Sequence, residues 1–183
     1  ANCRTVLLRA LRDHATVARD EAVAEAAARL ARILQTLSTP LPLQEVRGCE
    51  GEAAHTYFSV FDALIVQQKQ DFFFTQRTRR PPLDPLNALL SFVYTLLTHD
   101  VASALSAVGL DPAVGFLHRD RSGRPSLALD LMEELRPLLG DRLVLSLVNR
   151  QQVRGEAFRP SESGAVFMDD DTRKTVITAY QQR

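Results

Sequence analysis

The sequence predicts an all-α fold, a multi-helix bundle with one small β-hairpin late in the chain. Apolar residues recur at steps of three and four over most of the 183 residues. Only the segment 156–168 alternates as a strand does, around a Ser-Gly turn. Apolar residues make up 45% and charged residues 24%, which is typical of a globular chain that buries its own core. We therefore expect residues 1–183 to form one domain.

The first two predicted helices lie in the N-terminal third of the chain. Residues 20–37 are rich in strong helix formers, with acidic residues at the start and arginines later, as the helix dipole favours. A break at Ser38-Thr39-Pro40 separates them from a second periodic run between Val46 and Leu64. The periodicity is then lost over residues 67–82, which we expect to form an ordered connection with exposed cations.

The later helices are predicted from caps and apolar stripes. Asp84, followed by Pro85, is a good N-cap for a central helix that extends to about Gly109. Ser126 is a plausible cap for a helix through Leu138, and residues 141–153 form a further helical run. On the helix from Ser126, one narrow arc of leucines is expected to face the core and leaves Asp130 and Glu133 on the other side; these leucines are residues 127, 131, 135 and 138.

Composition excludes several classes of protein. Lys plus Arg and Asp plus Glu number 22 each, so net charge indicates neither a nucleic-acid partner nor an acidic one. Cys3 and Cys49 form no zinc or disulfide pattern. We expect no membrane span and no signal sequence, and hence a cytoplasmic protein. The chain begins without Met and ends within a helical pattern, so we expect a fragment of a longer protein.

A histidine and several acids are candidates for chemistry. His118 precedes an arginine-rich turn, and Asp130 and Glu133 share one helix face. Ordinary structural roles also explain these residues. His118 could be a loop residue, and Glu133 could pair with Arg136 in a surface ion pair worth a few tenths of a kcal/mol. Spacing alone favours the ion pair.

Glu50 lies between two glycines inside a helical pattern. Each interior glycine costs roughly 1 kcal/mol relative to alanine, so Gly48 and Gly51 suggest that something approaches the backbone closely. A tight helix crossing and a functional site explain this about equally well.

One imidazole with two or three carboxylates suits Mg²⁺ or Mn²⁺ and leaves coordination positions open for phosphate oxygens. Two arginine clusters could hold a nucleic-acid strand, although any single arginine is more simply a solvated loop residue. These arginines are Arg77, Arg79 and Arg80 in the first cluster, and Arg119, Arg121 and Arg124 in the second. No G-x-S-x-G elbow and no glycine-rich phosphate loop is present.

Four longer motifs run in order along the chain: "RGCEGEAAHTYFSVFD", "RRPPLDPLNALLSFVYTLLTHDVASALSAVGLDPAVGFLH", "GRPSLALDLMEELRPLLGDRLVLSLVNR" and "SGAVFMDDDTRKTVITAYQ". Together they resemble the CRISPR-associated integrase family Cas-one, especially the branch that accompanies type I-C systems. The resemblance covers most of the chain from about Gln44 onward. It implies metal ligands at Glu50, His118 and Glu133, with Asp130 as a nearby carboxylate that supports the site.

The resemblance also implies an activity and partners. The family inserts short DNA fragments into the CRISPR repeat array by metal-dependent attack of 3′-hydroxyls, and it cuts branched DNA. It acts as a homodimer with a Cas-two dimer, and often with a Cas-four nuclease that is separate or fused. From the resemblance we expect the family's N-terminal β-rich domain and C-terminal tail to lie outside this sequence. The competing hypotheses are a noncatalytic helical module that binds DNA or protein, and a metal phosphohydrolase that acts on small molecules.

Overall fold

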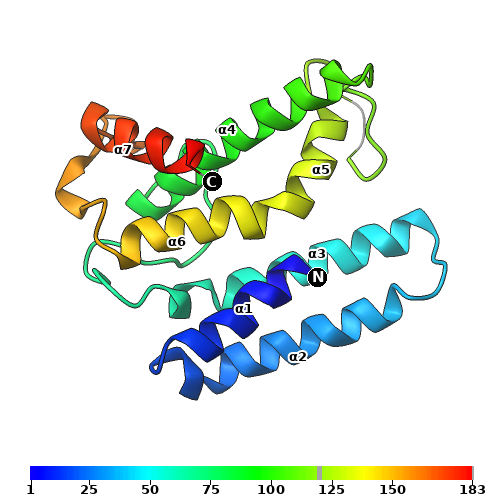
Figure 1. The fold of residues 1–183 in the computed structure, drawn as a ribbon, viewed down its shortest axis with the longest axis horizontal. Helices are drawn as coiled ribbons and strands as arrows, with labels where there is room; N and C mark the ends of the chain where they lie inside the picture. The colour runs from blue at the N-terminus through cyan, green and yellow to red at the C-terminus, as the bar shows by residue number, and fades with distance from the viewer. Residues whose placement is uncertain (119–120, 183) are drawn as a thin grey trace.

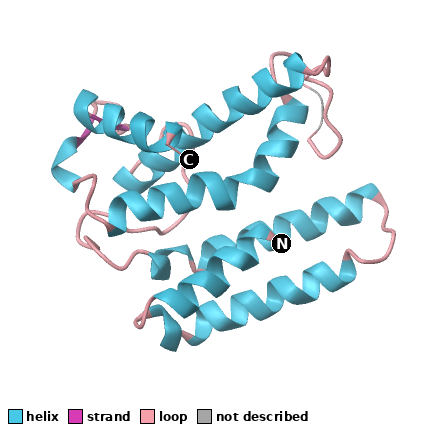
Figure 2. Ribbon diagram, viewed as in Figure 1, coloured by secondary structure: helices cyan, strands magenta, loops and turns pink. Residues whose placement is uncertain are grey.

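The computed structural model describes residues 1–118 and 121–182 and confirms the predicted fold class (Figure 2). The α-helices are α1 (Asn2–Asp13), α2 (Glu21–Thr36), α3 (Leu43–Ser59), α4 (Pro85–Ala107), α5 (Ser126–Arg136), α6 (Arg142–Asn149) and α7 (Asp170–Gln181). Short turns are η1 (Val17–Arg19), η2 (Phe61–Leu64), the π-helical η3 (Pro137–Asp141) and η4 (Gly155–Ala157). In Figure 1, α1 to α3 lie side by side, and α4 to α7 form a second group packed against them.

Local signals fix the start of two helices. The Asp20 carboxylate accepts hydrogen bonds from the backbone N–H groups of Ala22 and Val23, and caps α2. Asp84 caps α4 by accepting the backbone N–H of Asn87 at 2.7 Å. The second predicted run is interrupted, because α3 ends at Ser59 and η2 follows it. Helix α1 was not predicted.

Helix α4 is the central helix, as expected. Its buried side chains include Leu86, Leu89, Leu90 and Val93, which pack into the main hydrophobic core. By length and composition alone α4 could also cross a membrane, which corrects the expectation that no segment is long and apolar enough. Burial of these leucines inside the fold accounts for its apolar character.

The predicted hairpin consists of β1 (Phe158–Pro160) and β2 (Val166–Met168), which pair antiparallel with Phe158 opposite Met168. Gly164 lies in its turn with φ of +80°, a conformation that glycine adopts without strain. The backbone N–H of Val166 donates to the carbonyl of Pro82 at 2.9 Å and ties the hairpin to the segment before α4.

Helix α5 buries a face that differs in part from the predicted one. Ala128, Met132 and Arg136 are buried, whereas Leu131 is 44% exposed and Leu135 is 37% exposed. Ser126 is the first residue of the helix rather than its N-cap. The leucine arc is therefore only partly a core face, because Leu127 and Leu138 pack against the hydrophobic clusters whereas Leu131 and Leu135 are exposed and Arg136 turns inward.

Candidate metal centre

Two distant parts of the chain build the candidate site. Helix α3 carries Glu50, whereas the loop before α5 carries His118 and α5 itself carries Asp130 and Glu133. In Figure 1, α5 lies between α4 and α3. This arrangement brings residues more than 60 positions apart in sequence to neighbouring elements.

The carboxylate of Asp130 binds the loop that carries His118 through both of its oxygens. Its Oδ1 accepts the backbone N–H of His118 at 2.9 Å and lies 2.6 Å from the ring Nδ1 of the same residue. Its Oδ2 accepts the backbone N–H groups of Phe116 at 2.6 Å and Leu117 at 3.0 Å. Although burial alone would raise the pKa of Asp130, these hydrogen bonds hold it below the usual value. An ionised carboxylate has about four acceptor positions, so these four contacts use its capacity.

The contact with Asp130 also orients the imidazole of His118. Nδ1 must carry a proton to donate to an ionised carboxylate, so the neutral ring keeps its lone pair on Nε2. Metal-binding histidines are typically held in this way, by a carboxylate on the other ring nitrogen. The His118 side chain is 21% exposed, so the ring is not sealed inside the fold.

Arg47 holds the same loop from the opposite side, a role that sequence analysis did not identify. Its Nε donates to the carbonyl of Leu117 at 2.8 Å, and its Nη2 donates to the carbonyl of Phe116 at 3.2 Å. Because Asp130 binds the N–H groups of these two residues, the loop is fixed between α3 and α5. Arg47 opens the motif "RGCEG", one helical turn before Glu50, and that position was the available signal.

Glu50 lies within electrostatic reach of Glu133, His118 and Asp130. Partial burial raises the pKa of Glu50, and the negative charge of Glu133 raises it further, while His118 and Arg136 act in the opposite direction. A bound cation would offset the negative charge that raises the pKa of Glu50.

The glycines beside Glu50 do not mark a tight crossing. A Cβ atom added at Gly48 or Gly51 would meet no atom of the described residues within 4 Å, and both glycines are exposed. The expectation of close protein packing is therefore wrong. These glycines leave the α3 surface next to Glu50 open to solvent.

Glu133 and Glu134 have different surroundings. Glu133 Oε2 forms an ion pair with Nη1 of Arg136 at 3.3 Å. Arg136 is only 3% exposed, so the pair is not the surface ion pair that spacing suggested. Glu134 is exposed, and its Oε1 and carbonyl oxygen accept from the amide of Asn2. Glu134 thus anchors the start of α1 and takes no part in the candidate site.

The two arginine clusters are not uniform. The guanidinium of Arg77 points into the fold, where it donates to Asn87 at 2.7 Å and Ser91 at 3.0 Å and lies over the ring of Tyr94. The expectation of an exposed cation is therefore wrong for Arg77. Arg79, Arg80 and Arg121 are exposed and Arg124 is half-buried, whereas Arg119 lies outside the described residues.

The donor set of the candidate site fits a hard or borderline divalent ion. His118 offers Nε2, and Glu50 and Glu133 offer carboxylate oxygens, which is a set that Mg²⁺ and Mn²⁺ accept. Within residues 1–118 and 121–182, no three His, Cys, Asp or Glu side chains lie close enough together to hold an ion as they stand. Rotation of the glutamate side chains or closer approach of α3 and α5 would be needed to bring the three together.

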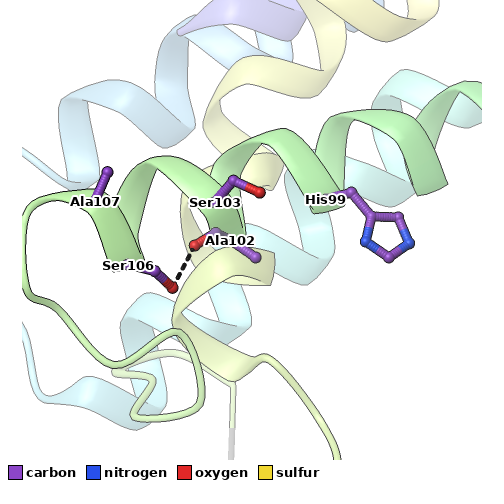
Figure 3. Close-up of a pocket in the computed structure, with 5 residues that line it drawn as sticks. All are labelled: His99, Ala102, Ser103, Ser106 and Ala107. Carbon is purple, nitrogen blue, oxygen red and sulfur yellow. Dashed lines mark hydrogen bonds between the residues drawn. The ribbon is translucent and has the colours of Figure 1, made fainter.

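A surface hollow on α4 does not coincide with this site. Figure 3 shows it beside His99, Ala102, Ser103, Ser106 and Ala107, all on α4, with a volume of about 570 Å³. The hydroxyl of Ser106 donates to the carbonyl of Ala102 at 3.0 Å. With His99 as its one titratable lining residue, this hollow cannot supply the acids that a divalent ion needs.

Comparison with known proteins places the chain among CRISPR proteins. It is 59% identical to CRISPR-associated endonuclease Cas1 2 of Rhodospirillum rubrum and 57% identical to CRISPR-associated endonuclease Cas1 1 of Chlorobaculum tepidum. Both matches cover 100% of this chain, but 54% and 53% of those proteins. The chain therefore spans about half the length of these relatives.

Other relatives and solved structures extend the comparison. The chain is 41% identical to a Cas4 exonuclease/Cas1 endonuclease fusion of Geobacter sulfurreducens, over 100% of this chain and 33% of the fusion. The solved structure of a Cas1 protein from Thermotoga maritima aligns with a TM-score of 0.76 and 30% identity, over 98% of this chain and 56% of that one. The family model described as "CRISPR associated protein Cas1" matches residues 1–182. The chain belongs to the Cas1 family, as its motifs suggested.

Proposed function

We propose that this chain is the helical catalytic part of a metal-dependent DNA integrase and endonuclease of CRISPR adaptation. It would insert short DNA fragments, or spacers, into the repeat array by attack of their 3′-hydroxyls on phosphodiesters. The observation that carries the proposal is that all four acceptor positions of the Asp130 carboxylate are used by the loop that carries His118. Because its four contacts hold the His118 loop, His118 presents Nε2, and Glu133 and Glu50 are left to act as ligands.

Each residue of the candidate site has a distinct task. His118, Glu50 and Glu133 would bind Mg²⁺ or Mn²⁺, which polarises the phosphodiester and lowers the pKa of a bound hydroxyl. Asp130 orients the imidazole and keeps Nδ1 protonated. Arg47 fixes the backbone of the loop and so helps to hold His118 in position.

Exposed and half-buried arginines would hold double-stranded or branched DNA beside this centre. Arg79 and Arg80 precede α4, and Arg121 and Arg124 precede α5. Arginine binds phosphate through paired N–H groups, which suits a polyanion longer than a small metabolite. We include Arg119 in this set on the sequence alone.

The partners follow from the family. We infer that the full-length protein is a cytoplasmic homodimer, that it works with a Cas2 dimer, and that a Cas4 nuclease, separate or fused, prepares the DNA. The Cas4/Cas1 fusion of Geobacter sulfurreducens supports the last point. The motifs further suggest the branch that accompanies type I-C systems.

The competing function is a noncatalytic helical module that binds DNA or protein. A Mn²⁺ titration followed by thermal unfolding separates the two. An ion that binds the folded chain stabilises it by about 2.7 kcal/mol at 100 times its dissociation constant. We expect this gain in the wild-type chain and its loss in His118→Ala, with Glu134→Gln as the control that keeps it. Equal behaviour of the wild type and His118→Ala would support the noncatalytic module instead.

A further inference from the structure

A cluster of buried polar side chains lies behind Glu133, where α5 continues through η3 into α6. Arg136 is 3% exposed, and Asp141 and Tyr57 are fully buried. Charged residues are rarely buried this deeply unless other groups compensate them. Arg136 links this cluster to the candidate site through its ion pair with Glu133.

Aromatic rings hold the guanidinium of Arg136 in place. Its carbon lies 4.9 Å from the ring centroid of Phe58 and 5.8 Å from that of Tyr94. Both distances are within the range of a cation–π interaction, and the planar guanidinium is well suited to such stacking. Arg136 therefore projects from α5 towards rings on α3 and α4, with little freedom to turn.

Asp141 compensates the buried charge. Its Oδ1 accepts the hydroxyl proton of Tyr94, which also lies under the guanidinium. No ion pair within 4.0 Å joins Asp141 and Arg136 in the described chain, so Asp141 acts on Arg136 through its charge rather than through a hydrogen bond. The π-helical turn η3 puts Asp141 at this buried position.

We propose that Arg136 is a positioning residue that fixes the carboxylate of Glu133. Nη1 of Arg136 binds Oε2 of Glu133 at 3.3 Å, so the restrained guanidinium restrains this carboxylate in turn and leaves Oε1 for a ligand. The inference rests on the proposed function in one respect, since that function makes Glu133 a metal ligand. The restraint on Glu133 itself rests on the contacts alone.

A matched pair of variants tests this role. Asp141→Asn keeps Arg136 and its contacts, and can still accept the Tyr94 hydroxyl. The double variant Arg136→Met with Asp141→Asn removes both buried charges together, which spares the fold an unpaired ion. Methionine fills much of the arginine stem volume but donates no hydrogen bond.

Two measurements are made on both variants and on the wild-type chain: a crystal structure without metal, and the Mn²⁺ dissociation constant by calorimetry. We expect Glu133 to keep its place in Asp141→Asn and to leave it in the double variant. We also expect Mn²⁺ binding about 10–100-fold weaker in the double variant than in Asp141→Asn, the usual cost of losing a partner of a metal ligand. Should the double variant not fold, Arg136→Lys is compared with the wild type, since its ammonium lacks the planar fork.

The outcomes are distinct. An unmoved Glu133 carboxylate and an unchanged dissociation constant in the double variant would overturn the positioning role. A displaced carboxylate in a chain whose wild type binds no Mn²⁺ would support the role of Arg136 and refute the proposed metal function.

Discussion

Asp130→Asn and Glu133→Gln should have different effects, although both acids lie on one helix. Glu133 is the proposed ligand, so Glu133→Gln should abolish strand cutting and joining at every Mn²⁺ concentration. Asp130 acts through His118, so Asp130→Asn should weaken the site without removing a ligand. Excess Mn²⁺ should therefore restore part of the activity of Asp130→Asn.

The size of the Asp130 effect follows from its four hydrogen bonds. Asparagine keeps one acceptor oxygen, so at least two of the hydrogen bonds to this side chain cannot form. A hydrogen bond to a charged group contributes about 1.5–3 kcal/mol, so two contribute about 3–6 kcal/mol. Phe116 is 75% exposed and water can take the place of its missing partner, which favours the lower end. Because the loosened loop must be ordered again when Mn²⁺ binds, a loss of about 3 kcal/mol then appears as a fall in Mn²⁺ affinity on the order of a hundredfold.

The assay is strand cutting and joining by the full-length protein over a range of Mn²⁺ concentrations, with unfolding measured on the same samples. Glu134→Gln is the matched control, because Glu134 is the next residue on α5 but binds Asn2 instead. If Glu133→Gln were restored by Mn²⁺ and Asp130→Asn were not, Asp130 would be the ligand and the reasoning from its saturated carboxylate would fail.

Further predictions concern the loop, the surface and the core. His118→Ala should remove metal-dependent activity and leave the unfolding temperature without Mn²⁺ nearly unchanged; normal activity in Mn²⁺ would refute the site. Replacing Arg79 and Arg80 by Gln should lower the salt slope of DNA binding by about one for each phosphate that the protein no longer binds, and an unchanged slope would make this segment a solvated loop. Gly51→Ala should raise the free energy of unfolding by up to about 1 kcal/mol, as measured by urea unfolding, because the added methyl group meets open space; a decrease would contradict this. Burial raises the pKa of Asp141 to about 6, so the folded chain binds a proton that the unfolded chain releases near pH 4. Stability should therefore fall by about 3 kcal/mol between pH 4 and pH 6 and stay lower above that range, and Asp141→Asn should remove this fall. A constant stability difference between Asp141→Asn and the wild type from pH 4 to pH 7 would contradict the prediction.

Much of the fold could be predicted from the sequence, because its signals are local. Asp20 and Asp84 cap the helices that they precede, and the Ser-Gly turn gives the hairpin. The buried face of α5 could not be predicted in this way. Leu131 and Leu135 look like core residues by periodicity, but the inward position belongs to Arg136. That choice depends on Phe58, Tyr94 and Asp141, which come from other elements and meet only in the folded chain.

The candidate site was harder to predict from the sequence than the fold. Glu50, His118 and Glu133 came from the family resemblance, since spacing alone left each with an ordinary explanation. Sequence spacing could not show that Asp130 and Arg47 bind the same short backbone segment. Asp130 accepts its N–H groups, and Arg47 donates to its carbonyl groups. Arg77 illustrates the reverse error, because nothing in "RTRR" distinguishes the inward arginine from the outward ones.

The hydrogen bonds from Arg47 to the loop before α5 affect how the protein should lose activity on heating. Its two hydrogen bonds join residues 70 and 69 positions apart, whereas Asp130 and His118 are 12 apart. Contacts between residues close in sequence form readily, whereas contacts between distant residues require whole segments to pack together. Such segments can separate by local unfolding before the whole protein unfolds. Separation of α3 would leave the Asp130–His118 unit intact and take Glu50 away from it. Activity should therefore disappear on heating while most of the helical circular dichroism signal remains.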